Sequence, residues 1–71
     1  MKFRVFRTSQ FSDDKPRKVE NAYKKGKYWY IKINTLEELI AFYEEYGNLI
    51  ISENWHNKKE LQIEIYDSYR E

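Results

Sequence analysis

The sequence predicts a small single domain of the α+β class over residues 1–71, with a mostly antiparallel sheet of about four strands and one amphipathic helix packed on one face. Apolar and polar residues alternate in several short segments. One longer segment has helical periodicity and a clear start signal. A chain of 71 residues without cysteine has room for one core, held by packing alone. The expected order is strand, loop, strand, helix, strand, strand.

The first strand is expected over residues 2–7. Phe3 and Val5 share one face of it, while Lys2, Arg4 and Phe6 share the other, which is the period of two that a half-buried strand shows. Residues 8–19 are rich in Ser, Asp and Lys around a proline, so they are expected to form an exposed loop.

Residues 19–25 leave two alternatives open. Val19, Ala22 and Tyr23 have the spacing of a short helix that the following glycine would end. Val19, Asn21 and Tyr23 also alternate as a strand does, and the Lys-Lys-Gly-Lys that follows suits the turn of a hairpin. The sequence slightly favours an extra hairpin arm over the short helix.

The next two elements have the clearest patterns. Trp29, Ile31 and Ile33 alternate with tyrosines and a lysine, which predicts a strand over residues 28–33 with a second face that is also aromatic. A helix should follow, because Thr35 and Glu38 have the spacing of a capping box, and Gly47 supplies the end. The stripe expected to lie on the sheet consists of Leu36, Leu39, Ile40, Tyr43 and Tyr46, with Phe42 at its margin.

Two further strands complete the expected sheet. Residues 48–52 predict a short buried strand around Leu49, Ile50 and Ile51. A polar connection over residues 53–60 then leads to a strand over residues 61–66, with Leu61, Ile63 and Ile65 pointing inward. The sheet face without the helix is expected to be open, or covered by the long loop or by a partner.

The residue types exclude most kinds of site chemistry. With no cysteine, one histidine and two glycines, the chain lacks a thiolate zinc site, a cysteine nucleophile and a glycine-rich phosphate loop. His56 has no partner at a catalytic spacing, and with Glu53, Asn54 and Asn57 it makes at most a weak surface metal site. We therefore expect no enzymatic activity, no catalytic residue, no metal and no cofactor.

The expected location is the cytoplasm. The N-terminal residues alternate charged with apolar types instead of forming the continuous apolar run of a signal peptide, and no stretch approaches membrane-spanning length. The absence of disulfides agrees with a reducing compartment. No membrane contact is expected.

Charge is divided unevenly along the chain. Residues 1–32 contain ten basic and three acidic residues, whereas residues 33–71 contain three basic and nine acidic residues. The two halves either cancel by packing against each other or leave one pole to meet a charged partner.

The helix suggests a protein-binding surface. Glu37, Glu38, Glu44 and Glu45 fall within about one-third of the helix circumference at roughly 100° per residue, and no lysine or arginine lies in the segment. A solvated face is one interpretation. The interpretation we favour is a non-enzymatic module whose acidic helix binds a basic surface of a host protein, such as the groove of a nucleic-acid-binding effector.

The alternative function uses the basic half. An outer sheet face that combines cations with aromatic rings has the side chains needed to bind single-stranded nucleic acid. The residues expected there are Lys2, Arg4, Phe6, Tyr28, Tyr30 and Lys32. Self-association through exposed rings and opposite poles is a third possibility, so that the chain is expected to be a monomer or a homodimer.

The last 44 residues resemble a group of known sequences. The strings YWYIKINTLEELI, YGNLII and IEIYDSYRE are similar to small phage-encoded or mobile-element proteins of low-GC Gram-positive bacteria. The shared pattern is structural, a capped helix between strands, and carries no catalytic residue. The resemblance implies a short non-enzymatic protein that blocks host machinery, as anti-CRISPR inhibitors do.

Overall fold

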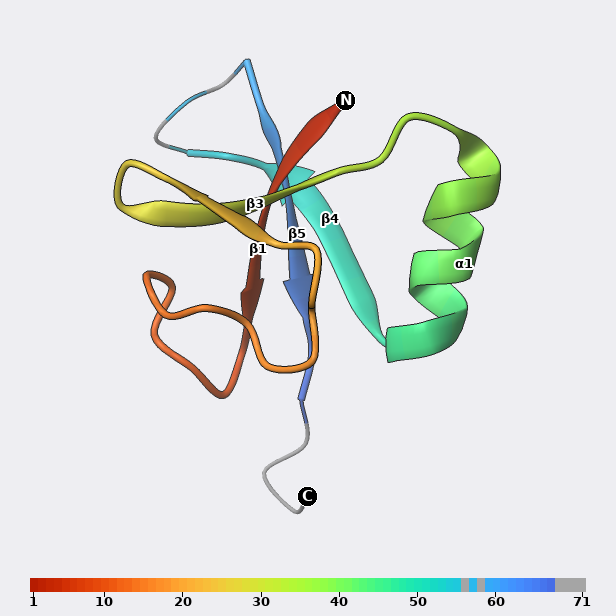
Figure 1. Ribbon diagram of the computed structural model, residues 1–71, viewed down its shortest axis with the longest axis horizontal. Helices are drawn as coiled ribbons and strands as arrows, with labels where there is room; N and C mark the ends of the chain where they lie inside the picture. The colour runs from red at the N-terminus through yellow and green to blue at the C-terminus, as the bar shows by residue number, and fades with distance from the viewer. Residues whose placement is uncertain (56, 58, 68–71) are drawn as a thin grey trace.

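The computed structural model describes residues 1–55, 57 and 59–67, and shows the predicted α+β class with five strands and one helix (Figure 1). The elements in chain order are β1 (Lys2–Arg7), β2 (Tyr23–Lys25), β3 (Tyr28–Lys32), α1 (Leu36–Tyr46), β4 (Leu49–Glu53) and β5 (Leu61–Ile65). The expected count of about four strands is one too low, because the ambiguous segment supplies β2.

The sheet has the order β2-β3-β1-β5-β4, so the first strand of the chain lies at its centre. β1 runs antiparallel to β3 and parallel to β5, while the outer pairs β2–β3 and β4–β5 are antiparallel. The prediction of a mostly antiparallel sheet is confirmed, and β2 and β4 form its two edges.

β2 is the arm of a hairpin. Lys25 pairs with Tyr28 across a two-residue turn, and Gly26 at its first position has a φ of +66°. This backbone region favours glycine, and glycine at the first turn position is typical of a type II′ hairpin. The hairpin alternative for this segment is therefore confirmed, with the strand confined to its last three residues.

The core lies between one face of the sheet and two covering segments. Phe3, Val5, Ile31, Ile63 and Ile65 are buried on this face. The covering segments are α1 and the loop after β1.

The loop after β1 is not the exposed loop that its composition predicts. Pro16 is fully buried, and Val19 and Ala22 belong to the core cluster. The polar residues of the loop remain outside, while a few apolar positions cover the half of the core that one helix leaves bare. The loop therefore covers the same sheet face as the helix, and the opposite face stays open.

α1 begins as predicted and packs differently from the prediction. The Thr35 hydroxyl accepts from the Glu38 N–H at 3.1 Å, and the Glu38 carboxylate accepts from the Thr35 N–H at 3.0 Å, which completes the capping box. The side chains that reach the core are Leu39, Phe42 and Tyr46.

The predicted stripe was wrong for Leu36, Ile40 and Tyr43, which are 70%, 48% and 55% exposed. The Tyr46 hydroxyl donates to the Lys18 carbonyl, and the Phe42 and Tyr46 rings pack at 4.6 Å, so the helix is turned toward the loop. Periodicity showed the spacing of the apolar positions, but the loop contact decides which of them face the sheet.

β4 is an edge strand and not the buried strand that its sequence predicts. Ile50 and Ile51 point to opposite faces and are 50% and 46% exposed. A strand at the edge has a neighbour on one side only, so its apolar run stays half uncovered.

None of the described helices is long and apolar enough to cross a membrane.

Candidate functional site

The charge asymmetry of the sequence becomes an asymmetry in space. The basic N-terminal half supplies β1, β2 and β3 on one side of the sheet, while the acidic half supplies α1, β4 and β5 on the other (Figure 1). Among the described residues, three ion pairs join the halves: Lys2–Glu60, Arg7–Asp67 and Arg17–Asp67. The halves are thus partly neutralised where they meet, and the outer surfaces keep their charge.

The ion pairs of Asp67 with Arg7 and Arg17 have a structural role. Arg7 donates to Asp67 at 2.6 Å with both side chains buried, and it also donates to the Arg17 carbonyl. Ser9 donates to the second carboxylate oxygen of Asp67 at 2.6 Å. The carboxylate of Asp67 and the guanidinium of Arg7 thus have their hydrogen-bond partners within this group. Together these bonds attach the loop and the residue Asp67 after β5 to the central strand β1.

The predicted acidic helix surface is present, with its four glutamates in different situations. Glu37 and Glu44 are exposed and point away from the core. Glu38 is engaged in the capping box. None of the four forms an ion pair with any residue that the structure describes.

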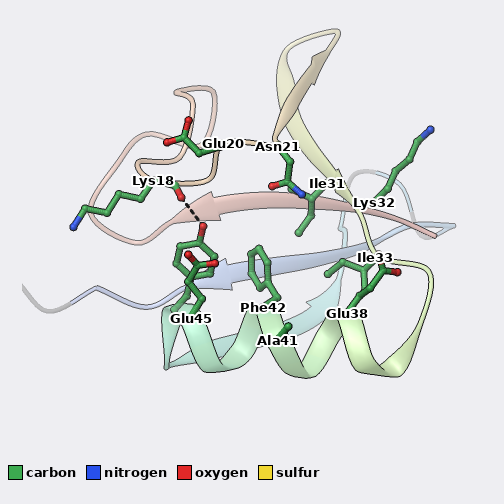
Figure 2. Close-up of a pocket in the computed structure, with 11 residues that line it drawn as sticks. Lys18, Glu20, Asn21, Ile31, Lys32, Ile33, Glu38, Ala41, Phe42 and Glu45 are labelled. Carbon is green, nitrogen blue, oxygen red and sulfur yellow. Dashed lines mark hydrogen bonds between the residues drawn. The ribbon is translucent and has the colours of Figure 1, made fainter.

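Glu38 and Glu45 line a hollow of about 370 Å³ between α1, β3 and the loop (Figure 2). Phe42 points into it from the helix, and Ile31 lies on the strand behind it. The ammonium groups of Lys18 and Lys32 extend away from the hollow in Figure 2. Glu38 and Glu45 therefore border the hollow, whereas Glu37 and Glu44 point outward.

Exposed apolar side chains accompany the outward glutamates. Leu36, Ile40 and Tyr43 lie along the flank of α1 next to Glu37 and Glu44. At the first turn of the helix, Leu36 lines a groove of about 310 Å³ whose lining is mostly apolar. Its apolar members are Met1, Phe3, Ile33, Leu36, Leu39, Ile51 and Leu61.

The residues of the alternative nucleic-acid site lie together on the open sheet face. The register places Lys2 opposite Lys32 and Arg4 opposite Tyr30, and alternation along the strands adds Phe6 and Tyr28 to the same face. The face is packed within itself. Arg4 is 6% and Tyr30 is 8% exposed, and the cations cover the rings: Lys2 lies 5.1 Å from the Tyr30 ring centre.

The register adds residues to this face that the sequence analysis did not place there. Tyr23 and Lys25 enter it from β2, Gln62 and Glu64 from β5, and Glu60 from the connection before β5. The nearby Lys2 ammonium lowers the pKa of Lys25, while the pKa of Lys2 is raised. Burial, together with the charge of Glu60, raises the pKa of Tyr30. None of these residues stands out in the sequence. Lys25 is placed by its local hairpin pairing with Tyr28, whereas Glu60 and Glu64 reach the face through the pairing of β5 with β1.

His56 lies outside the described residues, so the structure does not describe its surroundings. Within the described residues, no group of three metal-ligating side chains occurs. Comparisons with protein-family models, with curated proteins and with solved structures found no match for this chain.

Proposed function

We propose that this chain is a small non-enzymatic protein-binding module that attaches to a basic surface of a partner protein through the outer surface of α1. The observation that carries the proposal is the pairing of exposed Leu36, Ile40 and Tyr43 with the outward-pointing Glu37 and Glu44 on one helix. Apolar side chains at this helical spacing are the anchors by which a helix occupies a groove.

The negative charge of the helix glutamates indicates a partner with a basic surface. No described lysine or arginine pairs with the helix glutamates, so their charge is available to steer a basic surface and fix its orientation. The apolar groove beside Leu36 gives room for one side chain of the partner. A partner whose basic groove normally holds nucleic acid fits this description, and occupation of that groove would make the chain an inhibitor.

The test is capture on the immobilised protein from a nuclease-treated lysate of a low-GC Gram-positive bacterium. The captured protein is identified by mass spectrometry, and its affinity is then measured with purified components. Tyr43→Ala should weaken binding by roughly 1 kcal/mol or more if this ring is an anchor. Glu37→Gln/Glu44→Gln should weaken it by about tenfold at low salt and by less at high salt.

A matched control removes the same charge elsewhere. Asp13 and Asp14 are exposed in the loop away from α1, so Asp13→Asn/Asp14→Asn should leave the affinity unchanged. Equal affinities for the wild type, the Tyr43→Ala variant and the double Gln variant would exclude α1 as the docking surface.

A further inference from the structure

Arg4 on the open sheet face is a buried cation without a counter-charge. Its side chain has no hydrogen bond or ion pair with any described residue, and its Nε atom is buried without a partner. Its contacts are rings: Cζ lies 3.9 Å from the centre of Tyr28 and 5.2 Å from the centre of Phe6. Buried arginines normally meet a carboxylate, because an unpaired buried charge is costly.

Two described carboxylates share this face, and both have other partners. Glu64 lies beside Phe6 in the register with β5, and it accepts from the Thr8 hydroxyl at 2.7 Å. The Oε1 atom of Glu60 lies 3.6 Å from the Lys2 ammonium and accepts from the Asn57 amide at 2.7 Å, while its Oε2 atom is buried without a hydrogen bond to any described residue. Neither forms an ion pair with Arg4.

A further cation increases the excess. Lys25 pairs in register with Tyr28, the residue that stacks on Arg4, so it lies on the same face. Lys32 lies opposite Lys2 in the register and is a fourth cation of this face. The described carboxylates of the face are Glu60 and Glu64. Two positive charges are therefore left on a face that neither α1 nor the loop covers.

We propose that Arg4, Lys2 and Lys25 bind a phosphate group on the open face of the sheet. A phosphate monoester carries a charge of about −1.5 to −2 at neutral pH, which matches the uncompensated charge of the face. The flat guanidinium contacts the Tyr28 and Phe6 rings and its Nε atom is buried, so its two terminal nitrogens are the atoms left to bind phosphate oxygens. This site lies on the side of the sheet opposite α1 and is independent of the protein-binding function.

The probes are inorganic phosphate and a short single-stranded oligothymidine with or without a 5′-phosphate. Each should raise the melting temperature of the wild type in proportion to its occupancy. A shift with inorganic phosphate and the 5′-phosphorylated strand alone would identify a terminal monoester as the source. A shift with both strands would identify the phosphates of the nucleic-acid backbone.

Variants separate binding from a structural role. Arg4→Met keeps an apolar side chain between the rings, so it should weaken binding by about tenfold or more while the melting temperature without ligand stays equal or rises. Lys25→Gln should weaken binding by about threefold. Lys24→Gln is the matched control, because Lys24 is the next residue of β2 and points to the other face.

Two results would overturn the proposal. The first is a wild-type melting temperature that none of the three probes raises. The second is a shift of equal size in the wild type, Arg4→Met and Lys25→Gln, which would place the phosphate elsewhere. If Arg4→Met does not fold, Arg4→Lys and Lys25→Gln decide the question, since both are expected to weaken binding. Both should fold, because neither Arg4 nor Lys25 forms an ion pair with a described carboxylate.

Discussion

Arg4 and Arg7 show how far single residues could be predicted from the sequence. Alternation along β1 correctly placed Phe3 and Val5 in the core and Arg4 on the opposite face. It did not predict that both arginines are buried, because the residues that cover them belong to segments that lie far from β1 in the sequence. Asp67 reaches Arg7 from beyond β5, and Tyr28 reaches Arg4 from β3.

The buried Tyr30 and the half-buried Tyr46 make the free energy of unfolding depend on pH in the alkaline range. Burial raises the pKa of Tyr30 and Tyr46 above the ordinary value of 10.0. The folded state therefore keeps these protons at a pH where the unfolded chain releases them, which costs stability. We expect the contribution of these two rings to the free energy of unfolding to be constant below about pH 10 and to fall as the pH rises from there to the folded-state pKa values.

Urea unfolding at a series of pH values measures this dependence. The variant Tyr30→Phe/Tyr46→Phe should show a shallower decline, because phenylalanine has no proton to lose. An equally steep decline in the double variant would contradict the assignment to these two rings.

At the scale of elements, the sequence predicted the two ends of α1 correctly but not which of its side chains pack on the sheet. The capping box of α1 lies within four consecutive residues, so the sequence alone predicted its start at Thr35 and its end at Gly47. Which side of the helix faces the sheet depends on the contact between Tyr46 and Lys18, 28 positions apart. The acidic residues were placed correctly on the helix, but the apolar side chains beside them were missed.

The two edge strands differ in their protection against association. β2 carries lysines, which discourage strand pairing between molecules, whereas β4 has the apolar run Leu49, Ile50 and Ile51 at the opposite edge. We expect β4 to be the main route of aggregation when the protein is concentrated or partly destabilised.

Ile50→Lys should slow the growth of light scattering, because it puts a charge on this edge at a half-exposed position. Phe11→Lys is the matched control, since it replaces a side chain that is 82% exposed and lies in the loop away from the edge. An equal effect of both variants would mean that general hydrophobicity, not strand pairing, governs aggregation.

At the scale of the whole molecule, the class and the order of most elements follow from the sequence, but the arrangement of the sheet does not. Nothing in the sequence of β1 distinguishes a central strand from an edge strand. Its position follows from the parallel pairing with β5, from Phe3 opposite Leu61 to Arg7 opposite Ile65. The same pairing separates the basic and acidic halves in space.

Asp67 secures that arrangement, because one carboxylate binds Arg7, Arg17 and Ser9. Asp67→Ala would leave the Arg7 guanidinium buried without its charge partner, which typically costs about 3 kcal/mol of unfolding free energy. Asp14→Ala, at an exposed position of the loop, should cost under about 0.5 kcal/mol. Urea denaturation of both variants measures the difference, and equal values would exclude the proposed role of Asp67.

The parallel pairing of β1 with β5 also governs how the chain can fold during synthesis. Among the five described strands, β1 is synthesised first and is central in the sheet, whereas its neighbour β5 is synthesised last. Until β5 is available, β1 can pair only with β3, and its apolar face waits for β5 to complete the core. Closing this long loop slows folding. The core is therefore completed cooperatively once β5 has been made, and not step by step along the growing chain.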